Sequence, residues 1–208
     1  MSRGFKGKSG FTLIEMVIVL SIIATLAAIL VPTLIKYTAE SQMRRAQRDA
    51  QNISGSIGKF SSDTGLWPVS TNFNASGGGT TSKNDIDTLK GPGNDPTNNT
   101  TSGWLSTLGG TARTTDDLAD QLITNAADYK TTGKRAWSGP YLDRVEEDPW
   151  GNAYLVNVKF LQPGQIRNLK SVFVLSAGPD GEIDTPFENI ISPNIVEPQD
   201  DDIVSRLK

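Results

Sequence analysis

The sequence contains no cysteine and no histidine among its 208 residues. These two absences exclude a disulfide framework, a zinc site built from Cys and His, and a nucleophile activated by a histidine. Any bound metal would have to be held by oxygen atoms, which favours hard cations such as calcium. The formal net charge of −3 also gives no sign of the basic surface that nucleic-acid-binding proteins carry, so we expect no nucleic-acid partner.

Charged residues are almost missing from residues 11–35, where Glu15 is the only ionisable side chain. This apolar run is long enough to cross a bilayer, which takes about 20 residues, and in lipid its backbone must form a helix. The basic residues Arg3, Lys6 and Lys8 precede it and predict that the N-terminus stays in the cytoplasm. A secretory signal peptide fits poorly, because its apolar core is shorter and its cleavage site follows the core. An ordinary signal anchor remains an alternative.

Glu15 is the feature that separates a functional segment from a simple anchor. A carboxylate within a spanning helix costs about 2.5–3.5 kcal/mol on insertion, so it is a functional candidate by default. We expect it to meet a cation of a neighbouring subunit, and the α-amino group of Phe11 becomes such a cation only if the chain is cut after Gly10. The alternative is that Glu15 lies near the start of the helix, where the positive end of the helix dipole makes it tolerable.

Residues 8–15, KSGFTLIE, resemble the cleavage motif of the type IV prepilins. The basic leader, the glycine before the cut, the phenylalanine after it and the glutamate all match. The resemblance implies that residues 1–10 are a leader, and that a prepilin peptidase cuts between Gly10 and Phe11 and methylates the new N-terminus. Methylation keeps the amine positive. The resemblance also implies that the helix unwinds in filaments near Pro32, which by itself predicts only a lost hydrogen bond and a kink.

Apolar residues continue beyond the spanning segment at steps of three and four residues, which is the pattern of one helix face. They are Ile35, Ala39, Met43, Ala46, Ala50, Ile53, Ile57 and Phe60. The pattern predicts that residues 36–64 continue the helix and pack with this face on a folded domain. Gly65 and Pro68 then end the helix.

Residues 65–208 are expected to form that domain. Gly, Ser, Thr, Asn and Asp dominate residues 69–115, which predicts a long polar loop. A short helix is expected over 116–129. Alternating apolar residues in 153–160 and an apolar run at 171–176 predict an antiparallel hairpin. The predicted fold is therefore α+β, with a long N-terminal helix packed on a small C-terminal antiparallel sheet, as in pilins.

Residues 137–184 resemble the G-type major pseudopilin of type II secretion, through GPYL at 139–142 and DPWGN at 148–152. The resemblance implies a structural subunit, with no catalytic group, that polymerises with itself into a pseudopilus and drives protein export across the outer membrane. The implied partners are the prepilin peptidase, minor pseudopilins and an inner-membrane assembly platform. The implied location is the bacterial inner membrane, crossed once, with the C-terminal domain in the periplasm. The alternative is a major or minor pilin of a type IV pilus.

Acidic residues gather after the hairpin and in the C-terminal loop, residues 185–208. Asp180 and Asp184 lie on a glycine-bearing turn, and an acid of the tail could join them to bind calcium. The alternative is that these acids only cap backbone amides. The G-type resemblance implies a calcium site in this loop. We predict that Leu175, Asp180, Asp184 and Asp202 hold a structural calcium ion, with Asp202 chosen for its place just before Ile203.

Overall fold

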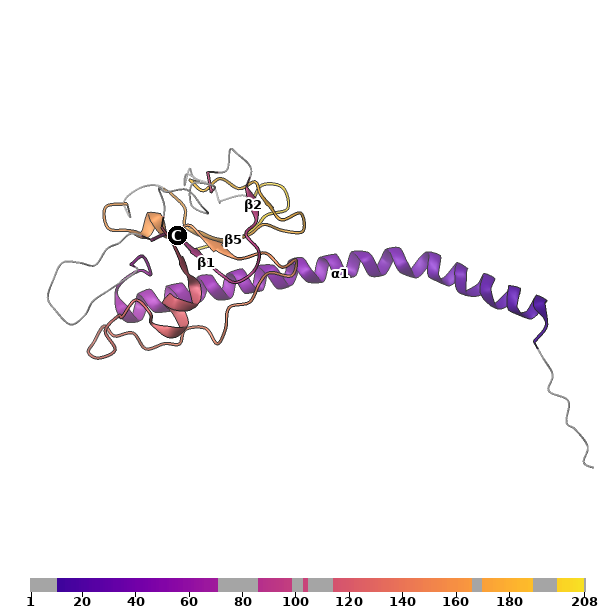
Figure 1. The fold of residues 1–208 in the computed structure, drawn as a ribbon, viewed down its shortest axis with the longest axis horizontal. Coiled ribbons are helices and arrows are strands. Elements are labelled where there is room, and N and C mark those ends of the chain that lie inside the picture. The colour runs from indigo at the N-terminus through magenta and orange to yellow at the C-terminus, as the bar shows by residue number, and fades with distance from the viewer. Residues whose placement is uncertain are drawn as a thin grey trace, which may run out of the picture. The chain divides into compact units, whose positions relative to one another are not determined.

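The computed structural model describes residues 11–70, 86–98, 103–104, 114–165, 170–188 and 198–207. The described part of the chain begins with one long helix, α1 (Leu13–Thr64) (Figure 1). The chain divides into two compact units, residues 1–42 and residues 43–208. The other elements are β1 (Ile86–Lys90), β2 (Thr97–Asn98), β3 (Thr114–Asp117), the π-helix η1 (Asp120–Thr124), β4 (Leu155–Val156), the 3₁₀-helix η2 (Val158–Leu161), β5 (Phe173–Ser176), β6 (Glu182–Ile183) and β7 (Ile203–Arg206).

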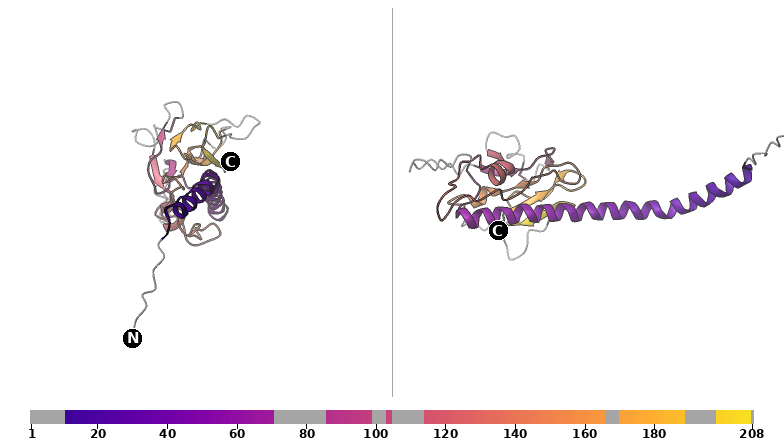
Figure 2. Two further views of the ribbon diagram at one scale, coloured as in Figure 1. Left: turned by 90° about the vertical axis from the view of Figure 1, so that its right-hand side faces the viewer. Right: turned by 90° about the horizontal axis from the view of Figure 1, so that it is seen from below.

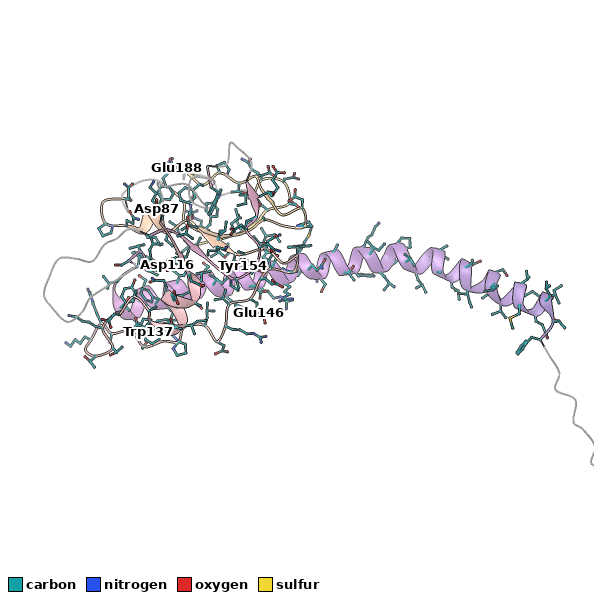
Figure 3. All side chains as sticks on the ribbon, viewed as in Figure 1. Asp87, Asp116, Trp137, Glu146, Tyr154 and Glu188 are labelled. Carbon is teal, nitrogen blue, oxygen red and sulfur yellow. The ribbon has the colours of Figure 1, made fainter. Side chains whose placement is uncertain are left out.

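The described part of the first unit is the N-terminal part of α1, which we call the stem. Every residue from 11 to 35 is exposed, and their side chains project outward around the helix (Figure 3). By length and composition this helix can cross a membrane. The hydroxyls of Ser21, Thr25 and Thr33 donate to the carbonyls of Ile18, Ser21 and Ile29 at 2.7, 2.8 and 3.1 Å. These three hydroxyls thus find their partners inside the helix, as a lipid environment requires.

The second unit is built on the rest of α1, which runs beside the sheet elements (Figures 1 and 2). The predicted apolar stripe is buried from Ala46 onward, and Phe60 packs edge-on against Tyr129 and Tyr141, at 4.9 and 5.6 Å between ring centroids. Buried residues of the helix and of the strands belong to one core. The helix does end in front of Gly65, which adopts a left-handed φ of 70°.

The main sheet has five strands in the order β3-β1-β4-β5-β7. The β1–β4, β4–β5 and β5–β7 pairs are antiparallel, but β1 and β3 are parallel. The α+β fold is confirmed, although the sheet is mixed where we expected a purely antiparallel one. The reason is that residues 86–90 of the predicted polar loop form β1, which lies inside the sheet with Ile86 and Leu89 fully buried.

The predicted hairpin is present as β4 and β5, with Leu155 opposite Leu175, but its first strand stops early. Asn157 is buried, and its Oδ1 accepts a bond from the Phe173 amide at 2.8 Å, while its Nδ2 donates to the carbonyls of Ser171 and Phe187 at 3.0 and 2.9 Å. A side-chain amide thus replaces the ladder bonds, and the chain turns into η2 instead of continuing as a strand.

A similar difference occurs in the predicted helix over 116–129. Its first residues complete β3, and only the π-helix η1 follows. Leu118 and Leu122 are both fully buried, so this segment still contributes to the core.

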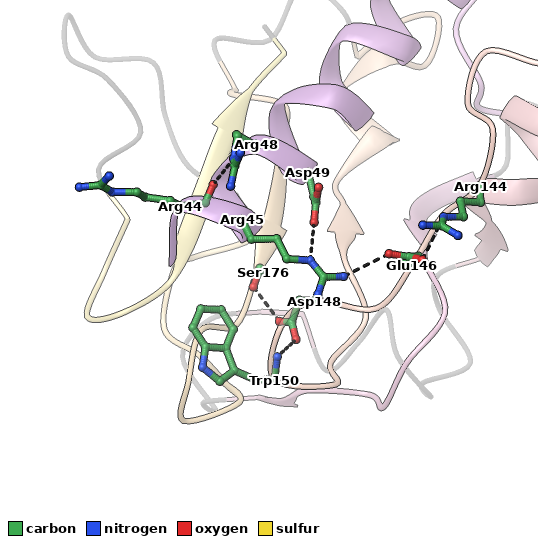
Figure 4. A network of polar contacts seen from close by, with 9 residues as sticks. All are labelled: Arg44, Arg45, Arg48, Asp49, Arg144, Glu146, Asp148, Trp150 and Ser176. Atoms are coloured by element: carbon green, nitrogen blue, oxygen red, sulfur yellow. Dashed lines mark hydrogen bonds and ion pairs between the residues drawn. The ribbon is translucent and has the colours of Figure 1, made fainter. Parts of the chain in front are cut away.

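The DPWGN turn is organised by the buried carboxylate of Asp148. Its Oδ1 accepts a hydrogen bond from the amide of Trp150 at 3.0 Å, and its Oδ2 accepts one from Ser176 Oγ at 2.7 Å (Figure 4). Oδ1 also accepts a hydrogen bond from the amide of Asn152 at 2.8 Å. Gly151 completes the turn with a φ of +89°. The carboxylate therefore caps the turn and ties it to the end of β5.

We predict that Asp148→Ala destabilises the second unit by about 2–4 kcal/mol, because two amides and one hydroxyl lose a buried charged acceptor. The melting temperature should fall by about 5–15 °C. Thermal unfolding of the full chain in detergent, followed by tryptophan fluorescence, measures this, since all four tryptophans lie in the second unit. Asp143 is exposed, so Asp143→Ala is the matched control. Equal melting temperatures for the two variants would contradict this role of Asp148.

Candidate functional site

Glu15 lies in the first turn of α1 and is bonded to Thr12 in both directions. The amide and the hydroxyl of Thr12 donate to Glu15 Oε2 at 2.8 and 2.7 Å, and the Glu15 amide donates to Thr12 Oγ1 at 3.3 Å. This is the capping box of a helix start, in which a Thr and a Glu three residues later satisfy each other's free amides. This capping box was not among the sequence predictions, although the T-x-x-E spacing of residues 12–15 signals it.

The capping box does not remove the electrostatic problem of the stem. Both hydrogen bonds that Glu15 accepts come from neutral groups of Thr12, so the carboxylate keeps its full charge. A cation from another copy would still stabilise it in an apolar environment. Phe11 is exposed beside this turn, whereas Gly10 lies outside the described residues, and Pro32 lies within the continuous helix. Processing at Gly10 and Phe11, and the assembly roles of Glu15 and Pro32, stay predictions.

A second candidate site lies where the turn after β5 meets the tail before β7. Asp180, Asp200 and Asp201 each bring one carboxylate oxygen within 4.8 Å of the others, and we call these three residues the acidic cluster. The Asp180 amide donates to Asp201 Oδ2 at 3.3 Å. Gly178 has a φ of +67°, and a Cβ there would lie 2.5 Å from the Asp201 carbonyl oxygen. Only glycine therefore lets the two segments approach this closely.

Asp202 stands beside the acidic cluster and holds the tail in place. Its Oδ2 accepts hydrogen bonds from the amides of Asp184 and Thr185 at 3.0 and 2.6 Å. Burial, with a contribution from the neighbouring Asp184 charge, raises the pKa of Asp202 to about 6. This capping of backbone amides is the alternative that the sequence analysis left open for these acids.

The structure thus brings together only part of the predicted calcium set. Asp180 belongs to the acidic cluster, Asp184 and Asp202 meet through a backbone amide, and Leu175 is fully buried in β5 between β4 and β7. The cluster adds Asp200 and Asp201. The choice of Asp202 rested on its place in the sequence, which does not determine which of three consecutive tail acids faces Asp180, because neighbouring residues in a turn point in different directions.

The acidic cluster fits a hard cation by the chemistry of its donors. Three carboxylates converge, and Oδ1 of both Asp201 and Asp202 is buried without a hydrogen-bond partner among the described residues. Buried oxygens of this kind need a hydrogen-bond donor or a cation as a partner. Carboxylate oxygens in flexible loops are common calcium ligands.

Four charged side chains of the second unit form a network on its surface (Figure 4). Arg45 contacts Asp49 at 3.5 Å and Glu146 at 3.1 Å, and Arg144 contacts Glu146 at 2.9 Å. All four side chains are at least one-third exposed, so each pair contributes little, on the order of 0–1 kcal/mol. The network joins α1 to the loop before the DPWGN turn.

The raised pKa of Asp202 predicts a pH-dependent stability in calcium-free buffer. The folded chain holds this proton more tightly than the unfolded chain between pH 3.8 and about 6, so stability should fall as the pH rises through this window. Asp202→Asn should reduce the slope, while Asp143→Asn should keep it. Melting temperatures of the full chain at several pH values measure the slope, and an unchanged slope in Asp202→Asn would contradict the assignment.

Two family models match this chain, one over its N-terminal segment and one over part of its second unit. A family model described as a prokaryotic N-terminal methylation motif matches residues 5–31, and the model of type II secretion system protein G matches residues 111–191. No solved structure matches significantly.

Three curated relatives show how far these similarities extend. The chain is 26% identical to type II secretion system core protein G of Escherichia coli K12, over 88% of this chain and 90% of that protein. It is 24% identical to core protein G of Aeromonas hydrophila, over 86% and 87%. It is 45% identical to the fimbrial protein EcpC of Eikenella corrodens, but there it spans only 40% of the relative. The chain therefore carries an N-terminal methylation motif and a region that matches type II secretion system protein G, and it is similar to core protein G over most of its length.

Proposed function

We propose that this chain is a structural subunit of a type II secretion pseudopilus, which polymerises through its N-terminal helix and drives protein export across the outer membrane. The observation that carries the proposal is the stem: an apolar helix exposed on all sides, with one acid in its first turn, continues into a folded unit. Such a surface is covered by lipid in the single subunit and by the stems of other copies in a filament.

Before assembly, the subunit crosses the bacterial inner membrane once. Its N-terminus is cytoplasmic and the unit from residue 43 onward is periplasmic, in keeping with the basic residues that precede the span. Prepilin peptidase removes the leader after Gly10, and the new amine of Phe11 then pairs with Glu15 of an adjacent copy. Minor pseudopilins and an inner-membrane assembly platform join this chain, and a cytoplasmic ATPase supplies the energy, since the subunit acts mechanically.

A type IV pilus pilin is the second candidate, favoured by the similarity to fimbrial proteins. The matches to EcpC and to the major pilin PilE of Neisseria gonorrhoeae cover only 30% and 29% of this chain. The matches to core protein G cover 86–88%. The pseudopilus hypothesis therefore accounts for the folded unit as well as for the stem.

We further propose that the acidic cluster of Asp180, Asp200 and Asp201 holds a structural calcium ion. The ion would supply positive charge that lets the converging carboxylates stay ionised. Asp202 supports the site by fixing the tail to the amides of Asp184 and Thr185. The turn that carries Asp180 and the tail that carries Asp200 and Asp201 have few apolar residues to hold them together. The ion would therefore stabilise their contact in place of apolar packing.

Charge pairing and helix capping by Glu15 can be separated by two substitutions. Glu15→Gln keeps an oxygen for the capping box but removes the charge, whereas Glu15→Leu removes both. We predict that both variants insert into the membrane and that filament yield falls at least about tenfold in both, because losing one partner of a buried ion pair costs about 3–5 kcal/mol.

The yield is measured by shearing and quantifying filaments from cells that overproduce the subunit. Glu40→Gln is the matched control, since Glu40 lies in the same helix outside the apolar run. Wild-type yield from Glu15→Gln, together with poor yield from Glu15→Leu, would show that the acid acts through the capping box and not through its charge.

The calcium proposal predicts a higher melting temperature of the full chain in calcium than in chelator. Saturation at about 1,000 times the dissociation constant stabilises by about 4 kcal/mol, which corresponds to a rise of about 8–16 °C. Asp201→Asn should lose the response, and Asp143→Asn should keep it. Equal melting temperatures of the wild-type chain with calcium and with chelator would refute the proposal.

A further inference from the structure

Residues 91–98 form a segment, here called the strap, that follows β1 and contacts two turns. Its first contact is with the DPWGN turn. The amide of Asn94 donates to the carbonyl of Gly151, and the amide of Ala153 donates back to the carbonyl of Asn94, both at 2.9 Å. A parallel bridge joins Asn94 and Asn152. The first half of the strap is therefore fixed to the turn that Asp148 organises.

The second half of the strap is bonded to the turn that carries Asp180. The amide of Thr97 donates to the carbonyl of Gly181 at 2.8 Å, and Thr97 Oγ1 donates to the same oxygen at 3.1 Å. β2 then pairs in parallel with β6, with Thr97 opposite Glu182 and Asn98 opposite Ile183. The strap thus reaches from one turn to the other and gives the Asp180 turn a strand partner.

Gly93 shows how closely the strap is seated. Its φ is +116°, and a Cβ there would lie 2.8 Å from the carbonyl carbon of Asn152 and 2.9 Å from the Ala153 nitrogen. These neighbours are backbone atoms that cannot rotate away, so the strap can lie in this position only with glycine at residue 93. An ion pair between Lys90 and Asp95 closes the start of the segment.

The contacts of the strap lead directly to the acidic cluster. The Glu182 amide donates to Asp180 Oδ1 at 2.8 Å, so the backbone next to Thr97 also orients the carboxylate of Asp180. The carbonyl oxygen of Gly181 accepts both hydrogen bonds from Thr97 and therefore points toward the strap. The position of one corner of the cluster is therefore set by residues that are not part of the cluster.

We propose that the strap is a positioning element for the cation site, with Gly93 and Thr97 as positioning residues. It holds the Asp180 turn in one conformation before a cation arrives, so that binding does not have to order the turn. Preorganisation of this kind raises affinity by removing an entropic cost. This inference rests on the proposed calcium site for its ligand, but the contacts of the strap are independent of any ion.

Calcium titration of the full chain in detergent, followed by calorimetry, tests the affinity. Gly93→Ala should raise the dissociation constant for calcium at least about tenfold, because the turn must then be ordered on binding. Gly133→Ala is the matched control, since Gly133 has a similar φ of +106° but open space around its Cβ. It carries the same backbone strain without touching the strap, and its dissociation constant should stay within about twofold of wild type.

A second pair of variants avoids backbone strain. Thr97→Val removes the hydroxyl bond to the Gly181 carbonyl and should weaken calcium binding by about threefold to tenfold. Thr97→Ser keeps the hydroxyl and should restore wild-type affinity. The melting temperatures of Thr97→Val and Thr97→Ser in chelator should agree. Equal values would show that a weaker affinity for calcium in Thr97→Val does not come from a less stable fold. Wild-type affinity in both Gly93→Ala and Thr97→Val would overturn the proposal.

Hydrogen exchange in chelator separates the strap from the calcium site. Gly93→Ala should increase amide exchange in residues 178–184 relative to wild type and Gly133→Ala, with no ion present. Unchanged exchange there would overturn the positioning role even if calcium binds. If the wild-type chain gives no calcium signal at all, the calcium proposal falls, and with it the cation part of the inference, while the exchange result still decides whether the strap holds the turn.

Discussion

The apolar surface of the stem has no cover within the described chain, and the rest of the account depends on this fact. Every residue from 11 to 35 is exposed. Removing apolar surface from water contributes about 25 cal/mol per Å², so a helix of this composition is not stable in water as a single copy. Lipid can cover it, and so can equivalent helices of other copies. A subunit that moves from the first environment to the second needs a feature that favours the filament, and Glu15 is the candidate because its charge is costly in lipid.

The folded unit is stabilised at its turns by polar side chains that accept hydrogen bonds from backbone amides in place of backbone carbonyls. Asp148 caps the DPWGN turn, Asn157 replaces ladder bonds between β4 and β5, and Asp202 caps the amides after β6. Each of these side chains is at least nine-tenths buried. Removing any of them leaves amides without acceptors, which explains how a unit with long polar segments keeps one defined structure.

Sequence reasoning succeeded where the signal is local and periodic. The stem and the stripe from Ala46 to Phe60 both follow from composition or spacing over a few residues. It failed where a distant partner decides. The segment Ile86–Lys90 is surrounded by polar residues, and only its neighbours β3 and β4 make it a strand. The choice among the tail acids likewise depends on Gly178 and Asp180 approaching from β5. The capping box of Thr12 and Glu15 is different, because the spacing of a threonine and a glutamate three residues later predicts it without any distant partner.

The decisive measurement is the identity of the N-terminal residue in assembled filaments, because the proposed partner of Glu15 exists only after processing. Mass spectrometry of the intact protein from sheared filaments should give a chain that begins at Phe11 and carries a methyl group on its amine. Assembled copies that retain the residues before Phe11 would contradict the account, since their stems would cover one another without the amine that is proposed to neutralise Glu15.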